Sequence, residues 1–140
     1  WGGGRILSSV AQYDPVTNAW EAAAPMAAAR DSHAVAVLDG KLYAVGGYSN
    51  DGVVLSSVER YDPALDAWEA VAPLTLARLG AGAAALEGKL YAVGGWVELE
   101  DKAEGERPAH SVERFDPASN AWEEVAPMAT ARAFPVALLM

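Results

Sequence analysis

Cysteine is absent from this 140-residue chain, which excludes disulfide bonds, thiolate catalysis and cysteine-ligated metal sites. Lysine and arginine number only 10 against 19 acidic residues, giving a formal net charge of −9. Because phosphates require a basic surface, nucleic acid is not an expected partner. No apolar run approaches the roughly 20 residues of a membrane span, so no membrane partner is expected either. The lack of cysteine fits a reducing compartment, and we expect a cytoplasmic location.

Histidine is scarce as well, with only His33 and His110 in the chain. Their spacing matches no metal-ligand motif, so a hydrogen-bonded histidine at a strand end is the preferred interpretation of each. The glycines of Trp1-Gly2-Gly3-Gly4 do not form a phosphate-binding motif, and no carboxylate pair can be placed around a substrate bond. We therefore expect no catalytic residue, no metal and no cofactor.

What the chain does contain is a repeat. The segments Val10–Arg30, Val58–Arg78 and Val112–Arg132 share one pattern, at offsets of 48 and 54 residues. Within each, an aromatic residue followed by Asp-Pro precedes a tryptophan and then a proline and an arginine. Self-similarity at such a period indicates a repeat architecture.

One complete unit contains four short strand patterns and their turns. Residues 33–38 (HAVAVL) are apolar and valine-rich, Asp39-Gly40 is a hairpin signal, and residues 41–45 (KLYAV) form the return strand. After Gly46-Gly47, strands are expected at residues 56–61 and 67–71. The next unit repeats the scheme with strands at residues 80–86, 89–93, 111–115 and 121–125. Four antiparallel strands in such a period match one blade of a β-propeller.

The blade pattern divides the chain into parts of a single propeller domain, residues 1–140. Residues 1–25 are expected to end one blade, 31–73 and 79–127 to form complete blades, and 133–140 to supply the first strand of another. The chain begins with Trp1 and not Met, so we expect it to come from a longer protein.

The sequence GKLYAVGG at residues 40–47 and 88–95, followed by a spaced Tyr or Phe and a spaced Trp, resembles the kelch repeat. The PMxxxR segments at 25–30 and 127–132 are similar to those of BTB-kelch adaptor proteins. The resemblance implies an all-β fold, a partial kelch β-propeller with four-stranded antiparallel blades. Tryptophan is large enough to fill the space between blades, and the glycine pairs permit close backbone approach. The residues assigned to this scaffold are Gly46, Gly47, Tyr61, Trp68, Gly94, Gly95, Phe115 and Trp122.

Connection lengths locate a candidate binding face. Between each glycine pair and the following valine lie six residues (4–9), then ten (48–57), then sixteen (96–111). In an antiparallel blade these connections share one end with the links around Arg30, Arg78 and Arg132. Variable loops on a constant scaffold are the usual sites of recognition.

The resemblance implies which residues of this face contact a substrate peptide. They are Asp31, Ser32, Tyr48 and Val54 in the first complete blade, Leu79, Gly80, Trp96 and Pro108 in the second, and Ala133 and Phe134 beyond it. The longest connection also carries Glu98, Glu100, Asp101, Glu104 and Glu106 against Lys102 and Arg107. We expect a neutral or basic peptide with Tyr48 and Trp96 as aromatic anchors; the alternative is a solvated loop that contacts nothing.

Three function classes follow from the resemblance. The first is a protein-interaction module, the substrate-recognition propeller of a cullin-RING ubiquitin ligase adaptor, with a cullin bound through a BTB domain. The second is an actin-binding cytoskeletal protein. The third is a kelch-type enzyme, either a sugar epimerase or a galactose-oxidase-like copper enzyme, whose cysteine-crosslinked tyrosine this chain cannot supply. A non-enzymatic module is the preferred prediction.

Overall fold

The computed structural model describes residues 4–98 and 105–137. These residues form short strands, turns and loops, and none of their segments is a helix that could cross a membrane. The strands are β1 (Val10–Asp14), β2 (Ala19–Ala23), β3 (Ala34–Leu38), β4 (Lys41–Val45), β5 (Val58–Asp62), β6 (Ala67–Val71), β7 (Gly82–Leu86), β8 (Lys89–Val93), β9 (Trp96–Glu98), β10 (Glu106–Pro108), β11 (Val112–Asp116) and β12 (Ala121–Val125).

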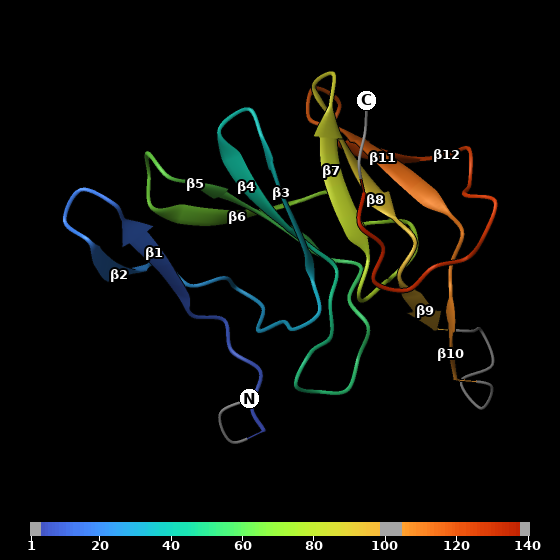
Figure 1. Ribbon diagram of the computed structural model, residues 1–140, viewed down its shortest axis with the longest axis horizontal. Coiled ribbons are helices and arrows are strands. Elements are labelled where there is room, and N and C mark those ends of the chain that lie inside the picture. Colours follow the sequence, from blue (N-terminus) through green and yellow to red (C-terminus); the bar gives the residue numbers. More distant parts are fainter. Residues whose placement is uncertain (1–3, 99–104, 138–140) are drawn as a thin grey trace.

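Two four-stranded antiparallel sheets form the centre of the molecule (Figure 1). One has the order β3-β4-β5-β6 and the other β7-β8-β11-β12, so each is a meander of the kind expected for a propeller blade. The register repeats as well, because Val45 lies opposite Val58 and Val93 lies opposite Val112. The prediction of an all-β fold with two complete four-stranded blades is confirmed.

The tight turns follow the predicted chemistry. Asp39 and Gly40 both have positive φ, 50° and 73°, as the hairpin between β3 and β4 requires. Glu87 and Gly88 adopt the same conformation between β7 and β8, with φ of 48° and 72°. The sheet geometry therefore imposes the turn on Glu87, although this residue type seldom adopts positive φ.

The aromatic residues pack as the repeat predicted. Tyr61 lies against Trp68 and Phe115 against Trp122, each with ring centroids 5.2 Å apart. Tyr43 of the first sheet meets Phe115 of the second edge-on at 5.9 Å, and both rings are buried. Strands β3 and β7 lie side by side where the two sheets meet (Figure 1).

Each tryptophan of a complete sheet also bonds to the preceding unit. The Trp122 Nε1 atom donates to the Ala72 carbonyl oxygen at 2.8 Å, and the Trp68 Nε1 atom donates to the Ala24 carbonyl oxygen at 2.9 Å. Tryptophan therefore joins neighbouring blades, as predicted, both by packing and by a hydrogen bond.

Two segments differ from expectation. Residues 133–137, expected to begin a strand, form none, while residues 138–140 of that prediction lie outside the described residues. Phe134 instead donates its backbone N–H to the Gly80 carbonyl oxygen, and Pro135 lies against Gly82 of β7. The long connection contains a two-stranded sheet, β9-β10, that sequence reasoning did not predict. Its first strand follows the glycine pair directly, where only a loop was expected.

Candidate functional site

The links and connections named in the sequence do gather at one end of the sheets, on the lower side of Figure 1. In the first complete sheet, Asp31 and Tyr48 exchange backbone hydrogen bonds of 3.0 and 2.9 Å. Tyr48 also forms a β-bridge with Val54. The structure thus brings these three predicted residues into contact.

The second sheet repeats this arrangement. Leu79 and Trp96 exchange backbone hydrogen bonds of 3.0 and 2.8 Å, and Trp96 lies opposite Pro108 in the β9-β10 pair. Glu98 lies opposite Glu106 at the far end of that pair; Glu106 is exposed and Glu98 is partly buried. The predicted site residues Glu100 and Asp101 lie outside the described residues.

The residues that follow each arginine connect one unit to the next. The Gly80 N–H donates to the Ser32 carbonyl oxygen at 2.6 Å, and the Phe134 N–H donates to the Gly80 carbonyl oxygen at 2.7 Å. All three have left-handed backbones, with φ of 49°, 59° and 50° for Ser32, Gly80 and Phe134. A Cβ atom on Gly80 would lie 2.6 Å from the Phe134 ring, so a side chain at this position would displace that ring.

The glycine pairs permit the close approach that the sequence predicted. A Cβ atom on Gly46 would lie 2.3 Å from the Arg78 carbonyl oxygen, and one on Gly94 would lie 2.6 Å from that of Arg132. Gly47 donates its N–H to the same Arg78 oxygen at 2.9 Å. The link therefore runs directly over the glycine pair of the preceding sheet.

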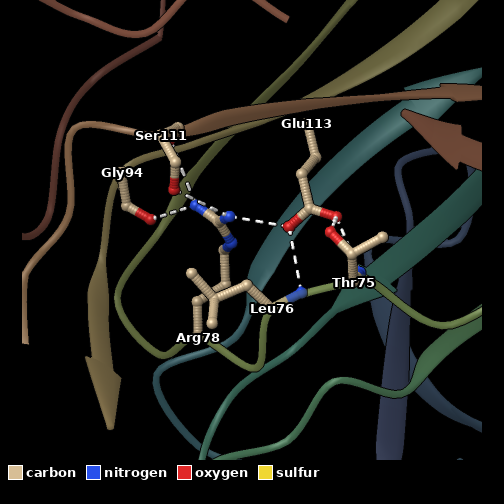
Figure 2. A network of polar contacts seen from close by, with 6 residues as sticks. All are labelled: Thr75, Leu76, Arg78, Gly94, Ser111 and Glu113. Atoms are coloured by element: carbon tan, nitrogen blue, oxygen red, sulfur yellow. Dashed lines mark hydrogen bonds and ion pairs between the residues drawn. The ribbon is translucent and has the colours of Figure 1, made fainter. Parts of the chain in front are cut away.

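A buried arginine at each junction organises this end of the sheets. Figure 2 shows Arg78, whose side chain is fully buried, reaching the Gly94 carbonyl oxygen at 2.7 Å and the Glu113 Oε2 atom at 2.7 Å. The same guanidinium donates to the Ser111 carbonyl and hydroxyl oxygens at 3.3 and 3.2 Å. Glu113 in turn accepts from the Thr75 backbone N–H at 2.7 Å. One ion pair therefore ties the link, the glycine pair and the end of the long connection together.

The preceding junction contains the same network. Arg30 donates to the Gly46 carbonyl oxygen at 2.6 Å, to the Ser57 carbonyl oxygen at 3.0 Å and to the Glu59 Oε2 atom at 2.6 Å. Glu59 accepts from the Ala27 N–H at 2.6 Å. Because a charge buried without a partner is costly, the repeated pairing fixes the geometry of each junction.

Sequence reasoning missed these carboxylates. The signal was present, because Ser57-Val58-Glu59-Arg60 recurs as Ser111-Val112-Glu113-Arg114. Each arginine was noted only as part of a motif, and each glutamate only as part of a strand. Neither pattern alone predicts that the two side chains meet.

The two histidines do not form a site. Burial lowers the pKa of His33 below its ordinary value, and the positive charge of Arg30 lowers that pKa further. The His33 Nδ1 atom is buried and has no hydrogen-bond partner in the described part of the chain, whereas His110 is exposed. Among residues 4–98 and 105–137, no cluster of His, Asp and Glu could hold a metal ion.

Comparison with known proteins identifies the family of the repeats. A family model described as the Kelch motif matches residues 1–27, 29–75 and 77–129. Mouse Kelch-like protein 35 is 51% identical over 49 residues, which are 35% of this chain and 8% of that protein. Human Kelch-like protein 5 is 50% identical over 44 residues, 31% of this chain and 6% of that protein. The aligned part thus spans less than a tenth of the length of these relatives.

Proposed function

The chain belongs to the kelch-repeat family, and from this premise we propose that it is a protein-interaction module that binds a peptide segment of a partner protein. The proposed surface is the loop face, which we define as Asp31, Ser32, Tyr48, Val54, Leu79, Gly80, Trp96, Glu98 and Pro108. The observation that carries the proposal is the repeated network of buried ion pairs that supports these residues. Buried Arg30 and Arg78 hold connections of different length in the same geometry, which gives a rigid base to variable loops.

The aromatic residues of the loop face are suited to peptide contact. Tyr48 and Trp96 occupy equivalent positions after their glycine pairs, and both side chains are partly exposed. Their backbones are fixed by paired hydrogen bonds, so little conformational entropy is lost when they contact a ligand. Partly exposed aromatic side chains on a fixed backbone are common anchors of protein interfaces.

The charge of the loop face favours a neutral or basic peptide. Asp31 and Glu98 contribute carboxylates to the loop face, and the carboxylate of Glu106 and the cations Arg5 and Arg107 lie beside it. Complementary charge raises the association rate and excludes partners of the same sign. An acidic peptide would meet repulsion from most of these groups.

The finer proposal is substrate recognition for a cullin-RING ubiquitin ligase. Its support is the resemblance of the PMxxxR links at residues 25–30 and 127–132 to those of BTB-kelch adaptors, together with relatives named Kelch-like proteins. Immunoprecipitation of the full-length protein from cells should recover a cullin. Its absence from such precipitates under conditions that retain other bound proteins would contradict the adaptor role.

Site-specific photo-crosslinking tests the interaction face itself. A photoreactive amino acid placed at Trp96 of the full-length protein should crosslink a partner segment that mass spectrometry can identify. The matched control places it at Leu65, which is 74% exposed in the turn between β5 and β6 at the other end of the sheet. Equal crosslinking of one partner from both positions would contradict the proposed face.

A further inference from the structure

A cavity that the sequence did not indicate lies beside the loop face and shares Asp31 and Tyr48 with it. It has a volume of about 490 Å³, within the range of ligand pockets, and lies between the first connection and the start of the first complete sheet. Its lining residues are Gly4, Arg5, Ile6, Leu7, Arg30, Asp31 and Tyr48.

The cavity lies where the first connection departs from the other two. Leu7 and Leu55 are equivalent, because their carbonyl oxygens accept from the Arg30 and Arg78 N–H groups in turn. Ile6 is therefore equivalent to Val54, which bridges to Tyr48 and is only 4% exposed. Residues 4–9 contain no aromatic residue, and Leu7 is 63% exposed. In the next unit, the aromatic residue Tyr48 of the same connection forms the bridge to Val54. Residues 4–9 supply no aromatic residue beside Ile6, so the apolar surface there is open to a ligand.

The walls of the cavity are fixed before any ligand binds. The Asn50 side chain donates to the Ile6 carbonyl oxygen at 2.9 Å and accepts from the Ile6 N–H at 2.8 Å. This amide pairs with the backbone of the first connection as a neighbouring strand would. Tyr48, which also lines the cavity, is held by its backbone hydrogen bonds to Asp31. The cavity is therefore preorganised, which reduces the entropic cost of binding.

The polar groups of the lining restrict the ligand further. The Arg30 guanidinium is already bonded to Glu59, Gly46 and Ser57. Asp31 and Arg5 are both exposed, and neither forms an ion pair within the part of the chain that the structure describes. They provide one carboxylate and one guanidinium beside the apolar residues Ile6 and Leu7 of the cavity.

We propose that this cavity takes a large apolar side chain of a bound peptide, flanked by a basic residue that pairs with Asp31 and an acidic residue that pairs with Arg5. The inference rests on the proposed function and specifies its ligand, a peptide that is neutral in sum. Apolar burial supplies most of the affinity, and the two charges set the direction of the peptide.

Fluorescence anisotropy with defined peptides tests this ligand class. The probes are fluorescein-labelled Gly-Ser-Lys-Phe-Glu-Ser-Gly amide and the peptide with Lys and Glu exchanged, titrated with the full protein to millimolar concentration. One order should bind, and replacing its Phe with Ala should weaken binding about tenfold or more, because burial of a phenyl ring is lost.

Variants locate the binding event. Leu7→Trp should fill the cavity and abolish binding, whereas Leu65→Trp, equally conservative at a distant exposed site, should leave it unchanged. Asp31→Asn should weaken binding several-fold, and Asp39→Asn, at the opposite end of β3, should not. Circular dichroism of each variant verifies the fold.

The possible outcomes separate this inference from the proposed function. Phe-dependent binding that Leu7→Trp removes supports the cavity. Binding that survives Leu7→Trp, or that does not depend on Phe, overturns it, as does the absence of binding by either peptide. In those cases, crosslinking from Trp96 still decides whether the loop face binds a protein.

Discussion

The hairpin β1-β2 and its equivalents β5-β6 and β11-β12 share their aromatic residues but not their charges. Tyr13 and Trp20 pack in a tilted arrangement with ring centroids 5.4 Å apart, close to the 5.2 Å of the other two pairs. Yet Ala11 and Gln12 occupy the positions of Glu59 and Arg60. Hairpin closure therefore depends on the aromatic pair, and the charges serve another purpose.

That purpose is to dock the link between units. Glu59 and Glu113 hold Arg30 and Arg78 and accept backbone N–H groups of the preceding link. A second, exposed pair joins Arg60 to Glu69 and Arg114 to Glu123. Hairpin β1-β2 can form neither pair. The difference predicts that stability and loop-face geometry depend on the buried pair far more than on the exposed one.

The largest effect is expected from Glu113→Ala. Removing this carboxylate leaves the Arg78 charge buried without its partner, which should cost about 3–5 kcal/mol of unfolding free energy. The control Glu123→Ala removes an exposed partner and should cost less than about 1 kcal/mol. Urea denaturation of both variants measures the difference. Equal losses would mean that the buried pair does not hold the junction.

Trp20 has no preceding unit among the described residues, so it should contribute less to stability than Trp122, by a smaller margin than the two glutamates differ. Trp122 is 8% exposed and bonded to the Ala72 carbonyl oxygen, while Trp20 is 71% exposed. Trp122→Phe loses ring volume and leaves that carbonyl unpaired, at a cost of about 1–3 kcal/mol. Trp20→Phe should cost at most about 0.5 kcal/mol. Similar shifts of the denaturation midpoint would contradict the assignment of tryptophan to the space between units.

The sequence separation of the interacting residues decides how much of the fold and of the site could be predicted from sequence. Strands, turns and aromatic pairs depend on local patterns that recur, so residues 31–73 and 79–127 could be assigned strand by strand. The glycine pairs also signalled close approach correctly. The meeting of Arg78 with Glu113 could not be predicted, since it joins residues 35 apart and places charges in a buried position that charged residues seldom occupy.

The connections were predictable only in part. Their lengths pointed to the correct end of the sheets, and the contacts of Asp31 with Tyr48 and of Leu79 with Trp96 follow from the repeat. The β9-β10 pair did not, because Glu106–Pro108 is charged and contains proline, which strands usually disfavour. The cavity beside Ile6 depends on a side-chain amide of the next unit, which no local pattern reveals.

The smallest expected effect concerns His33, which has Ala81 and Pro135 at the equivalent positions of the other links. Its pKa is lowered in the folded protein, mainly by burial, from an ordinary value of 6.5. The unfolded chain therefore binds a proton at higher pH than the folded one, so stability should fall as the pH drops below about 6.5. His33→Gln should reduce this dependence, as measured by urea denaturation over a range of pH. An identical pH profile for this variant and the unaltered chain would refute the role of burial.

The central claim is that the loop face, held by the buried arginines, binds the partner. The most direct test is isothermal titration calorimetry with the partner segment that photo-crosslinking at position 96 identifies. Tyr48→Ala and Trp96→Ala should each weaken binding about tenfold or more, as expected of interface anchors. Trp20→Ala, outside the loop face, should leave the affinity unchanged. Unaltered affinity in both loop-face variants, or an equal loss in Trp20→Ala, would contradict the account.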